Sequence, residues 1–232
     1  MLPPMSTATT KDGAKDLAPA GTLRVTEIFY SLQGEADTAG APTVFVRLTG
    51  CPLRCRYCDT EYAFTGGDRK TVDQILQDVG QYPTRLVTVT GGEPLAQRDV
   101  HLLLTKLCDT GYQVSLETGG SLDIQPVDPR VSIVLDIKTP ASGESERNRL
   151  ENLKHISSKD QIKFVICNRD DYEWSRDFVR QHGLDRMCVI WFSPSYGQIN
   201  PRDLADWILQ DNLPVRLQLQ LHKSLWGDER GR

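Results

Sequence analysis

The chain has 232 residues, of which 39% are hydrophobic and 25% are charged, and its 27 Lys and Arg against 31 Asp and Glu give a net charge of −4. This length and apolar content predict a single globular domain with a buried core and exclude wholesale disorder. The sequence contains no dense basic run, which disfavours binding to nucleic acid or to an anionic membrane surface. It also contains no stretch of the roughly 18 apolar residues that a membrane span needs.

Residues 1–20 mix Ser, Thr, Ala, Pro, Lys and Asp and lack the continuous apolar segment of a secretory signal. We expect them to form a flexible tail ahead of one domain, residues 21–232. Six cysteines without such a signal indicate a reducing cytoplasm, where thiols act as ligands or core residues rather than as disulfides.

From residue 23 onward, apolar runs of strand length alternate with segments of helical period, a pattern typical of repeated β-α units. Most of the expected strands are rich in Val, Ile and Leu, as buried parallel strands are. They comprise residues 23–30, 43–48, 85–89, 112–117, 131–137, 161–166, 187–192 and 215–219.

Helices are expected at residues 71–81, 97–110, 144–156, 170–181 and 201–210. In the first, apolar residues recur at i, i+3, i+4 and i+7, and Thr71 forms a capping box with Gln74. The last has Asn200 as its cap and Pro201 at its first position. Roughly six β-α units in about 200 residues fall short of the about 250 residues of an eight-unit barrel. We therefore expect an α/β fold with a partial, open barrel of the (β/α)6 type.

Three cysteines, Cys51, Cys55 and Cys58, follow the strand at residues 43–48 with Cys-x3-Cys-x2-Cys spacing. A structural zinc site would need four closed ligands, and no fourth is in sight, since the other cysteines, Cys108, Cys167 and Cys188, lie in helix or strand patterns typical of core residues. A [4Fe–4S] cluster held by three cysteines leaves one iron open to a small chelator.

This spacing, with Tyr57 before the third cysteine and Gly-Gly-Glu-Pro at residues 91–94, resembles the radical S-adenosylmethionine (SAM) superfamily. The resemblance implies a [4Fe–4S] cluster on Cys51, Cys55 and Cys58, SAM chelated to the open iron, and a 5′-deoxyadenosyl radical that abstracts a substrate hydrogen. Further polar residues, at 117–120 and 136–138, end strands, where α/β folds place their ligands. The resemblance places SAM contacts at Tyr57, Cys58, Asp59, Gly92, Lys138 and Ser193.

A second set of residues, the stretch 27–35 with Arg47 and the Cys58-Asp59-Thr60 triplet, is similar to the 7-carboxy-7-deazaguanine synthase family. That resemblance implies a radical SAM carbon–nitrogen lyase that converts 6-carboxy-5,6,7,8-tetrahydropterin to 7-carboxy-7-deazaguanine with release of ammonia, for queuosine biosynthesis. It further implies Mg²⁺ as a cofactor, a homodimer and a flavodoxin or ferredoxin as reductant. No catalytic residue is expected beyond the cluster and the SAM radical. Substrate contacts are implied at Leu32, Gln33, Gly34, Arg47 and Thr90.

The residue chemistry agrees with these roles. Arg47 offers a cation for the pterin carboxylate and Gln33 offers donors and acceptors for the ring edge, although Arg47 could instead form a surface pair with Glu35. The Thr60 hydroxyl suits Mg²⁺, which prefers oxygen ligands, but Asp59 and Thr60 could equally cap the next turn. His222 and Lys223 could cap the site or end a strand, and the segment from there to Arg232 has no assigned role.

Two other functions remain as alternatives. A glycyl-radical-activating enzyme has the same cysteine spacing in a short chain but acts on a protein. A non-catalytic iron–sulfur electron carrier would need four cysteines for each cluster, whereas the convincing set here has three.

Overall fold

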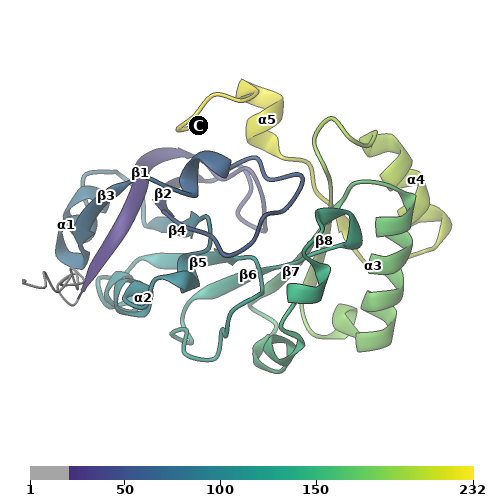
Figure 1. Ribbon diagram of the computed structural model, residues 1–232, viewed down its shortest axis with the longest axis horizontal. Helices are drawn as coiled ribbons and strands as arrows, with labels where there is room; N and C mark the ends of the chain where they lie inside the picture. Colours follow the sequence, from purple (N-terminus) through teal and green to yellow (C-terminus); the bar gives the residue numbers. More distant parts are fainter. Residues whose placement is uncertain (1–20) are drawn as a thin grey trace, which may run out of the picture.

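The computed structural model describes residues 21–232, and its centre is one open nine-stranded sheet with the order β3-β1-β2-β4-β5-β6-β7-β8-β9 (Figure 1). From β2 to β9 every neighbouring pair is parallel, whereas β1 is antiparallel to both β2 and β3. The strands are β1 (Thr22–Leu32), β2 (Pro42–Leu48), β3 (Asp68–Thr71), β4 (Leu86–Gly91), β5 (Gln113–Thr118), β6 (Ser132–Ile137), β7 (Gln161–Ile166), β8 (Val189–Pro194) and β9 (Arg216–Leu217).

The expected partial, open α/β barrel is confirmed by this sheet. Two details differ from the sequence prediction. The strand expected at residues 23–30 lies outside the β-α repeat, because it forms an antiparallel hairpin with β2 and pairs with the unexpected edge strand β3. The strand expected at 215–219 shortens to β9, because the Gln218 side chain turns inward and bonds both the amide and the carbonyl of Ala36.

Four of the five expected helices are present: α1 (Val72–Val79), α2 (Val100–Asp109), α3 (Arg169–His182) and α4 (Pro201–Gln210). The Thr71–Gln74 capping box and the Asn200 cap are both formed. A short helix that the sequence did not predict, α5 (Leu221–Trp226), follows β9. Within the described residues no helix has both the length and the apolar content to cross a membrane.

The prediction of a helix at residues 144–156 is wrong, because this region forms the 3₁₀ turns Ser145–Arg147 and Leu150–His155. Two asparagines explain the difference, because their amides bind backbone groups outside the segment. Asn148 bonds the amide and the carbonyl of Lys138, and Asn152 bonds the carbonyls of Gly120 and Leu122. The segment is thereby tied to the ends of β5 and β6 instead of coiling on itself.

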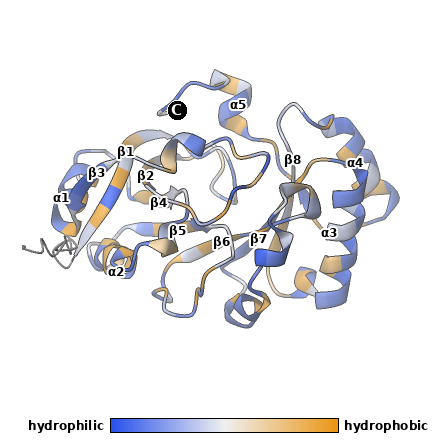
Figure 2. Cartoon of the chain, in the orientation of Figure 1, coloured by the Kyte–Doolittle hydropathy of each residue, from blue (hydrophilic) through white to orange (hydrophobic). Residues whose placement is uncertain are grey.

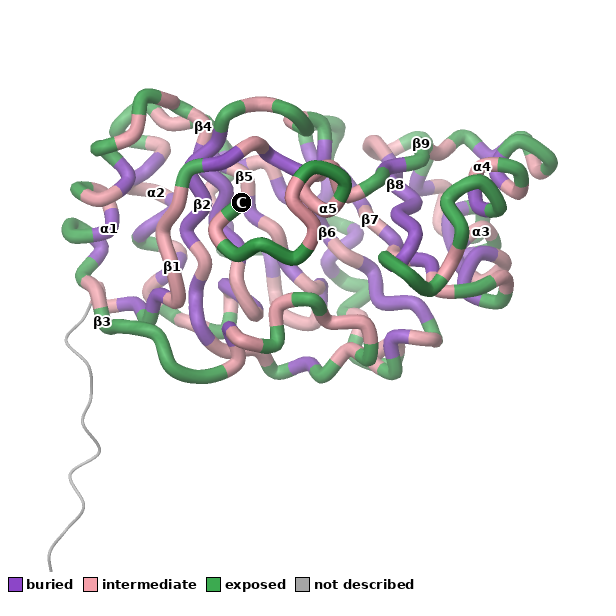
Figure 3. Tube along the Cα trace, turned by 90° about the horizontal axis from the view of Figure 1, so that it is seen from above, coloured by how far each residue is buried: buried purple, intermediate pink, exposed green. Residues whose placement is uncertain are grey.

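The core lies between the sheet and its helices. Apolar residues of the strands and of the inner helix faces are orange in Figure 2, and the purple stretches of the central strands and of the helices in Figure 3 are buried. At the β7–β8 end, Phe164 packs edge-on against Trp174, Phe178 and Phe192. Because these layers fix the strands, the loops after the parallel strands meet at one edge of the sheet, where α5 and the chain end also lie (Figure 1).

Candidate active site

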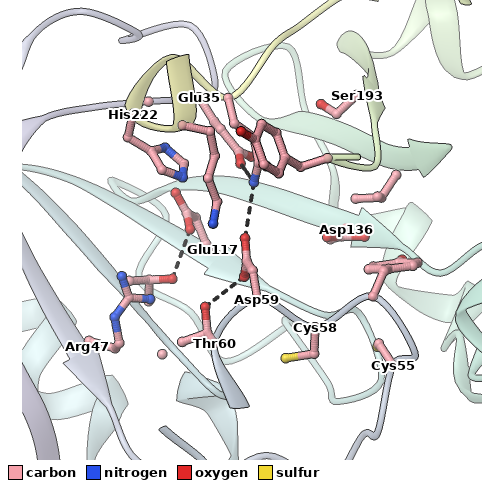
Figure 4. A pocket seen from close by; sticks show the side chains of 18 of the residues that line it. Glu35, Arg47, Cys55, Cys58, Asp59, Thr60, Glu117, Asp136, Ser193 and His222 are labelled. Carbon is pink, nitrogen blue, oxygen red and sulfur yellow. Dashed lines mark hydrogen bonds between the residues drawn. The ribbon is translucent and has the colours of Figure 1, made fainter. Parts of the chain in front are cut away.

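A cavity of about 460 Å³ opens where the parallel strands end. Figure 4 shows Cys55, Asp136 and Ser193 on one side of it and Arg47, Glu117 and His222 on the other, with Asp59 and Thr60 between them. We call the two sides the cysteine end and the arginine end. All of the residues expected as cluster, SAM, substrate or Mg²⁺ contacts line this one cavity, namely Leu32, Gln33, Gly34, Arg47, Cys51, Cys55, Tyr57, Cys58, Asp59, Thr60, Thr90, Gly92, Lys138 and Ser193.

The cysteine loop, residues 50–60, is held in place by the segment after β6. The amide of Arg54 donates to Glu144 Oε1 at 2.6 Å and the amide of Arg56 donates to the Ser142 carbonyl at 3.0 Å. The Arg54 guanidinium lies 4.3 Å from the centre of the Phe64 ring and donates to the Cys51 carbonyl. The loop therefore keeps an irregular shape without helix or sheet bonds of its own.

The three cysteines of this loop are half-buried free thiols. Burial raises the pKa of Cys55 to about 11 and also raises the pKa of Cys51 and of Cys58. Among residues 21–232 no three His, Cys, Asp or Glu side chains come close enough to share a single metal ion. A cluster differs from a single ion because each thiolate binds its own iron. Three thiols spread along one cavity wall fit that donor arrangement.

The Gly-Gly-Glu-Pro motif ends β4 directly against the cysteine loop. A Cβ at Gly92 would lie 2.3 Å from the Gly50 carbonyl oxygen, and one at Gly91 would lie 2.2 Å from the Leu48 carbonyl oxygen, so only glycine permits this approach. The buried Glu93 carboxylate accepts bonds from the Leu95 amide, the Gly119 amide and the Thr118 hydroxyl. Burial raises the pKa of Glu93, although these hydrogen bonds act to lower it.

The cysteine end presents polar groups without partners. Tyr57 Oη, Asp136 Oδ1 and Ser193 Oγ are buried and find no hydrogen-bond partner within residues 21–232. Lys138 Nζ lies 3.1 Å from Asp136 Oδ2 and 5.8 Å from the centre of the Tyr57 ring. Burial opposes the charge of Lys138, but Asp136 outweighs it and raises the lysine pKa. Buried polar groups are normally bonded, so this end suits a ligand as rich in hydrogen-bonding groups as SAM.

The arginine end contains a hydrogen-bond network around Glu117. Thr90 Oγ1 donates to Glu117 Oε2 at 2.9 Å, and Gln33 Nε2 donates to Glu117 Oε1 at 3.4 Å and to Thr88 Oγ1 at 3.0 Å. Burial, reinforced by the nearby charge of Glu35, raises the pKa of Glu117. The sequence singled out Glu117 only as one of several polar residues that end strands.

Arg47 faces the cavity from β2. Its Nε donates to Glu27 Oε1 at 2.7 Å, and its guanidinium lies 5.7 and 5.8 Å from the ring centres of Phe29 and Tyr62. The alternative that Arg47 pairs with Glu35 is wrong, because Glu35 Oε2 instead accepts a 2.6 Å bond from Lys163. Within residues 21–232, Arg47 finds a hydrogen-bond partner only for its Nε–H, so its other N–H groups could bind a carboxylate.

Thr60 lies between the two ends. Its hydroxyl donates to Asp59 Oδ1 at 2.8 Å, and although Thr60 precedes the turn Glu61–Ala63, its side chain does not cap that turn. Desolvation works against ionisation of Asp59, but hydrogen bonds from Thr60 and Gln220 outweigh it and lower the pKa of Asp59.

The C-terminal segment, residues 221–232, lines the same cavity with His222, Lys223 and residues 227–232, and of these the sequence offered only His222 and Lys223 as candidates for the site. His222 and Lys223 lie in α5 rather than at the end of a strand. The Arg230 guanidinium lies 4.2 Å from the centre of the Tyr62 ring. Neither periodicity nor a motif marks residues 227–232, because only the chain's return across the strand ends brings them to the site.

Comparisons with known proteins agree with this geometry. Residues 45–138 match the family model of the radical SAM superfamily. The chain is 47% identical over 213 residues to a 7-carboxy-7-deazaguanine synthase of Chlorobaculum tepidum, covering 90% of this chain and 97% of that protein. It is 44% identical to the 7-carboxy-7-deazaguanine synthase of Koribacter versatilis, covering 89% and 98%.

The fold is similar to a solved structure. The crystal structure of QueE from Escherichia coli superposes with a TM-score of 0.68 at 23% identity, covering 87% of this chain and 95% of that chain. With an identity this low, the superposition supports the fold, and the two sequence relatives carry the family assignment. The chain belongs to the 7-carboxy-7-deazaguanine synthase family of the radical SAM superfamily.

Proposed function

We propose that the chain is a 7-carboxy-7-deazaguanine synthase, a radical SAM lyase that converts 6-carboxy-5,6,7,8-tetrahydropterin to 7-carboxy-7-deazaguanine and ammonia in the queuosine precursor pathway. The observation that carries the proposal is the 47% identity to a synthase of the same length range, of which 97% is covered. The single cavity supports it, since three thiols and an arginine with free donors face the same space.

At the cysteine end, Cys51, Cys55 and Cys58 would hold a [4Fe–4S] cluster. When bound, the cluster and SAM supply the one-electron chemistry that removes a hydrogen atom from the substrate. The Gly92 backbone, which can approach the cysteine loop only because it has no side chain, would contact the SAM amino acid group. The unpartnered Tyr57 and Ser193 hydroxyls and the Lys138 ammonium would bond its polar atoms, with Asp59 beside the third cysteine.

At the arginine end, the Arg47 guanidinium would pair with the pterin carboxylate in a planar fork. Gln33 and Thr90 would bond the ring edge, and the backbone of Leu32 and Gly34 would frame it. Gln33 and Thr90 already donate hydrogen bonds to Glu117. Glu117 would therefore hold both side chains in place when they bond the substrate, or the substrate would replace Glu117 as their acceptor.

Mg²⁺ and Thr60 form a separate part of the proposal. The Thr60 hydroxyl would ligate a Mg²⁺ that also binds the pterin carboxylate, since Mg²⁺ commonly uses one or two protein oxygens together with waters and substrate oxygens. We expect added Mg²⁺ to activate the native protein and Thr60→Val to lose most of that response while its iron content is unchanged. An unaltered activation curve in Thr60→Val would exclude this ligand.

The electron donor, the oligomeric state and the compartment also belong to the proposal. A flavodoxin or ferredoxin would reduce the cluster, two copies of the chain would form the active homodimer, and the enzyme would act in the cytoplasm. The free thiols within the described residues are compatible with a reducing compartment. Light scattering on the reconstituted protein should give twice the mass of one chain, and a single-chain mass would exclude the homodimer.

The deciding experiment incubates anaerobically reconstituted protein with dithionite, SAM and 6-carboxytetrahydropterin and follows the deazapurine product by mass spectrometry. We expect product and ammonia in equal amounts. If 5′-deoxyadenosine forms without product, the substrate assignment is wrong, and a protein substrate of the glycyl-radical kind becomes the next one to test.

A further inference from the structure

Gln220, directly before α5, joins two carboxylates that are far apart in the sequence. Its Nε2 lies 2.9 Å from Glu35 Oε1 and 3.2 Å from Asp59 Oδ2. One acceptor belongs to the segment after β1 and the other to the cysteine loop, so a single amide connects three parts of the chain at the cavity wall. Neither the motifs nor the proposed chemistry gives Gln220 a role.

Both acceptors are carboxylate oxygens. Burial works against ionisation of Glu35, but Lys163 outweighs it with a 2.6 Å bond, and the pKa of Glu35 is lowered. Asp59 accepts a bond from the Thr60 hydroxyl at Oδ1 and one from Gln220 at Oδ2. Hydrogen bonds to charged acceptors are about twice as strong as those between neutral groups. The Gln220 amide therefore lies between two carboxyl groups and donates to each.

The same contacts continue across the site. Lys163, which bonds Glu35, also lies 3.6 Å from Asp136 Oδ2 at the cysteine end. Polar contacts thus run without a break from Thr60 through Asp59, Gln220, Glu35 and Lys163 to Asp136. Figure 4 shows Asp59 and Glu35 facing each other across the middle of the cavity, which is the position that Gln220 bridges.

The residues after Gln220 bring the C-terminal segment against the chain near residue 34. The next amide, that of Leu221, donates to the Gly34 carbonyl at 3.0 Å, and His222 packs so closely that a Cβ at Gly34 would lie 2.1 Å from its Nδ1. Lys223 and residues 227–232 then line the cavity. Because α5 has only six residues and buries none of them, its own packing holds it weakly.

We propose that Gln220 is a positioning residue that holds the C-terminal segment over the arginine end by bonding Glu35 and Asp59 together. The inference rests on the proposed function, since the closed segment completes the wall around the pterin and excludes water from the reacting centre. Loss of the bridge frees α5 and leaves two carboxylates facing each other.

The test compares Gln220→Leu, which removes the donor at similar volume, with Gln220→Glu, which keeps the shape but adds a third carboxylate. Gln210→Leu, at the exposed end of α4, is the matched control. Hydrogen exchange of residues 221–232 is measured first on protein without cluster or SAM. We expect residues 221–232 to exchange faster in both Gln220 variants than in the native protein, and faster in Gln220→Glu than in Gln220→Leu. The control Gln210→Leu should exchange as the native protein does.

In the reconstituted enzyme we expect KM for the carboxypterin to rise about tenfold in Gln220→Leu, as for the loss of one charged hydrogen bond. Iron content should stay as in the native protein, and the ratio of 5′-deoxyadenosine to product should increase. If Gln220→Glu exchanges no faster than Gln220→Leu, the residue contributes packing alone and the proposal is wrong. If the native enzyme forms no product, the proposed function fails, whereas the exchange experiment still decides the role of Gln220.

Discussion

Arg47 makes three contacts that depend on its planar guanidinium. It forms an ion pair with Glu27 and cation–π contacts with the rings of Phe29 and Tyr62. Lysine keeps the charge but loses the fork and the stacking. We expect Arg47→Lys to raise KM for the carboxypterin about tenfold while SAM cleavage without substrate changes less. Steady-state kinetics with both assays checks this. An unchanged KM together with a loss of iron would make Arg47 structural.

Five of the six cysteines fall into two groups by position. Cys51, Cys55 and Cys58 line the cavity, whereas Cys108 and Cys188 pack against the core. Alanine at any of the first three should abolish the roughly four-iron content and turnover. Alanine at Cys108, Cys167 or Cys188 should keep the iron, with a stability loss of about 1 kcal/mol. Iron analysis after reconstitution checks both groups, and iron loss in the second group would overturn the ligand assignment.

Glu35 predicts a pH dependence of stability. Its pKa is lowered from the ordinary 4.5 because Lys163 outweighs the effect of burial. A carboxylate with a lowered pKa stabilises the fold above its unfolded pKa and loses this contribution as pH falls through the folded value. We expect Glu35→Gln to be destabilised most near neutral pH, with the difference from the native protein shrinking below about pH 4.5.

Urea unfolding of both proteins at several pH values measures that difference, and Glu151→Gln, at an exposed position, is the control variant. A difference that is constant from neutral to acidic pH would mean that the Lys163 ion pair contributes nothing to it.

At the scale of elements, the start of α1 depends on a local signal. Thr71 accepts from the Gln74 amide at 3.2 Å while Gln74 Oε1 accepts from the Thr71 amide at 2.8 Å. Thr71→Ala leaves one helix N–H unbonded, so we expect a loss of about 1 kcal/mol in the free energy of unfolding. Exposed Thr65→Ala, outside any helix or strand, should change it by less than about 0.5 kcal/mol. Equal losses in the two variants would contradict the capping explanation.

Elements without such a local signal were the ones that the sequence missed. The segment 144–156 has the composition of a helix, yet Asn148 and Asn152 bond the ends of distant strands. Helix α5 is too short for a periodic pattern and is seated by Gln220 and Leu221 against residues near 34. Strand β3 has no apolar alternation and forms because β1 offers it an edge.

At the scale of the whole molecule, the aromatic cluster around Phe164 joins the late strands to α3. Phe164 is fully buried and contacts Trp174, Phe178 and Phe192. Phe164→Ala should lower the free energy of unfolding by about 3–5 kcal/mol, because it removes buried area and leaves a cavity. Leu209→Ala, at a side chain that is 76% exposed, should have little effect. A Phe164 loss below about 1 kcal/mol would mean that the cluster repacks.

The sequence by itself determined the class of fold, the cysteine loop and the family. Each depends on residues close together in the chain: apolar runs of strand and helix period, a capping box, and two motifs that end strands. Such signals involve residues only a few positions apart, so they can be recognised without knowing the rest of the structure.

The tertiary structure alone decided which of those residues share a site and what each one bonds. Glu35 pairs with Lys163, 128 positions away, rather than with Arg47, and Gln220 reaches both Glu35 and Asp59. These contacts follow from the sheet order and from the return of the chain end across it, which no local pattern encodes. The charge state of each buried carboxylate depends in turn on that neighbour, because desolvation must be offset by a specific partner.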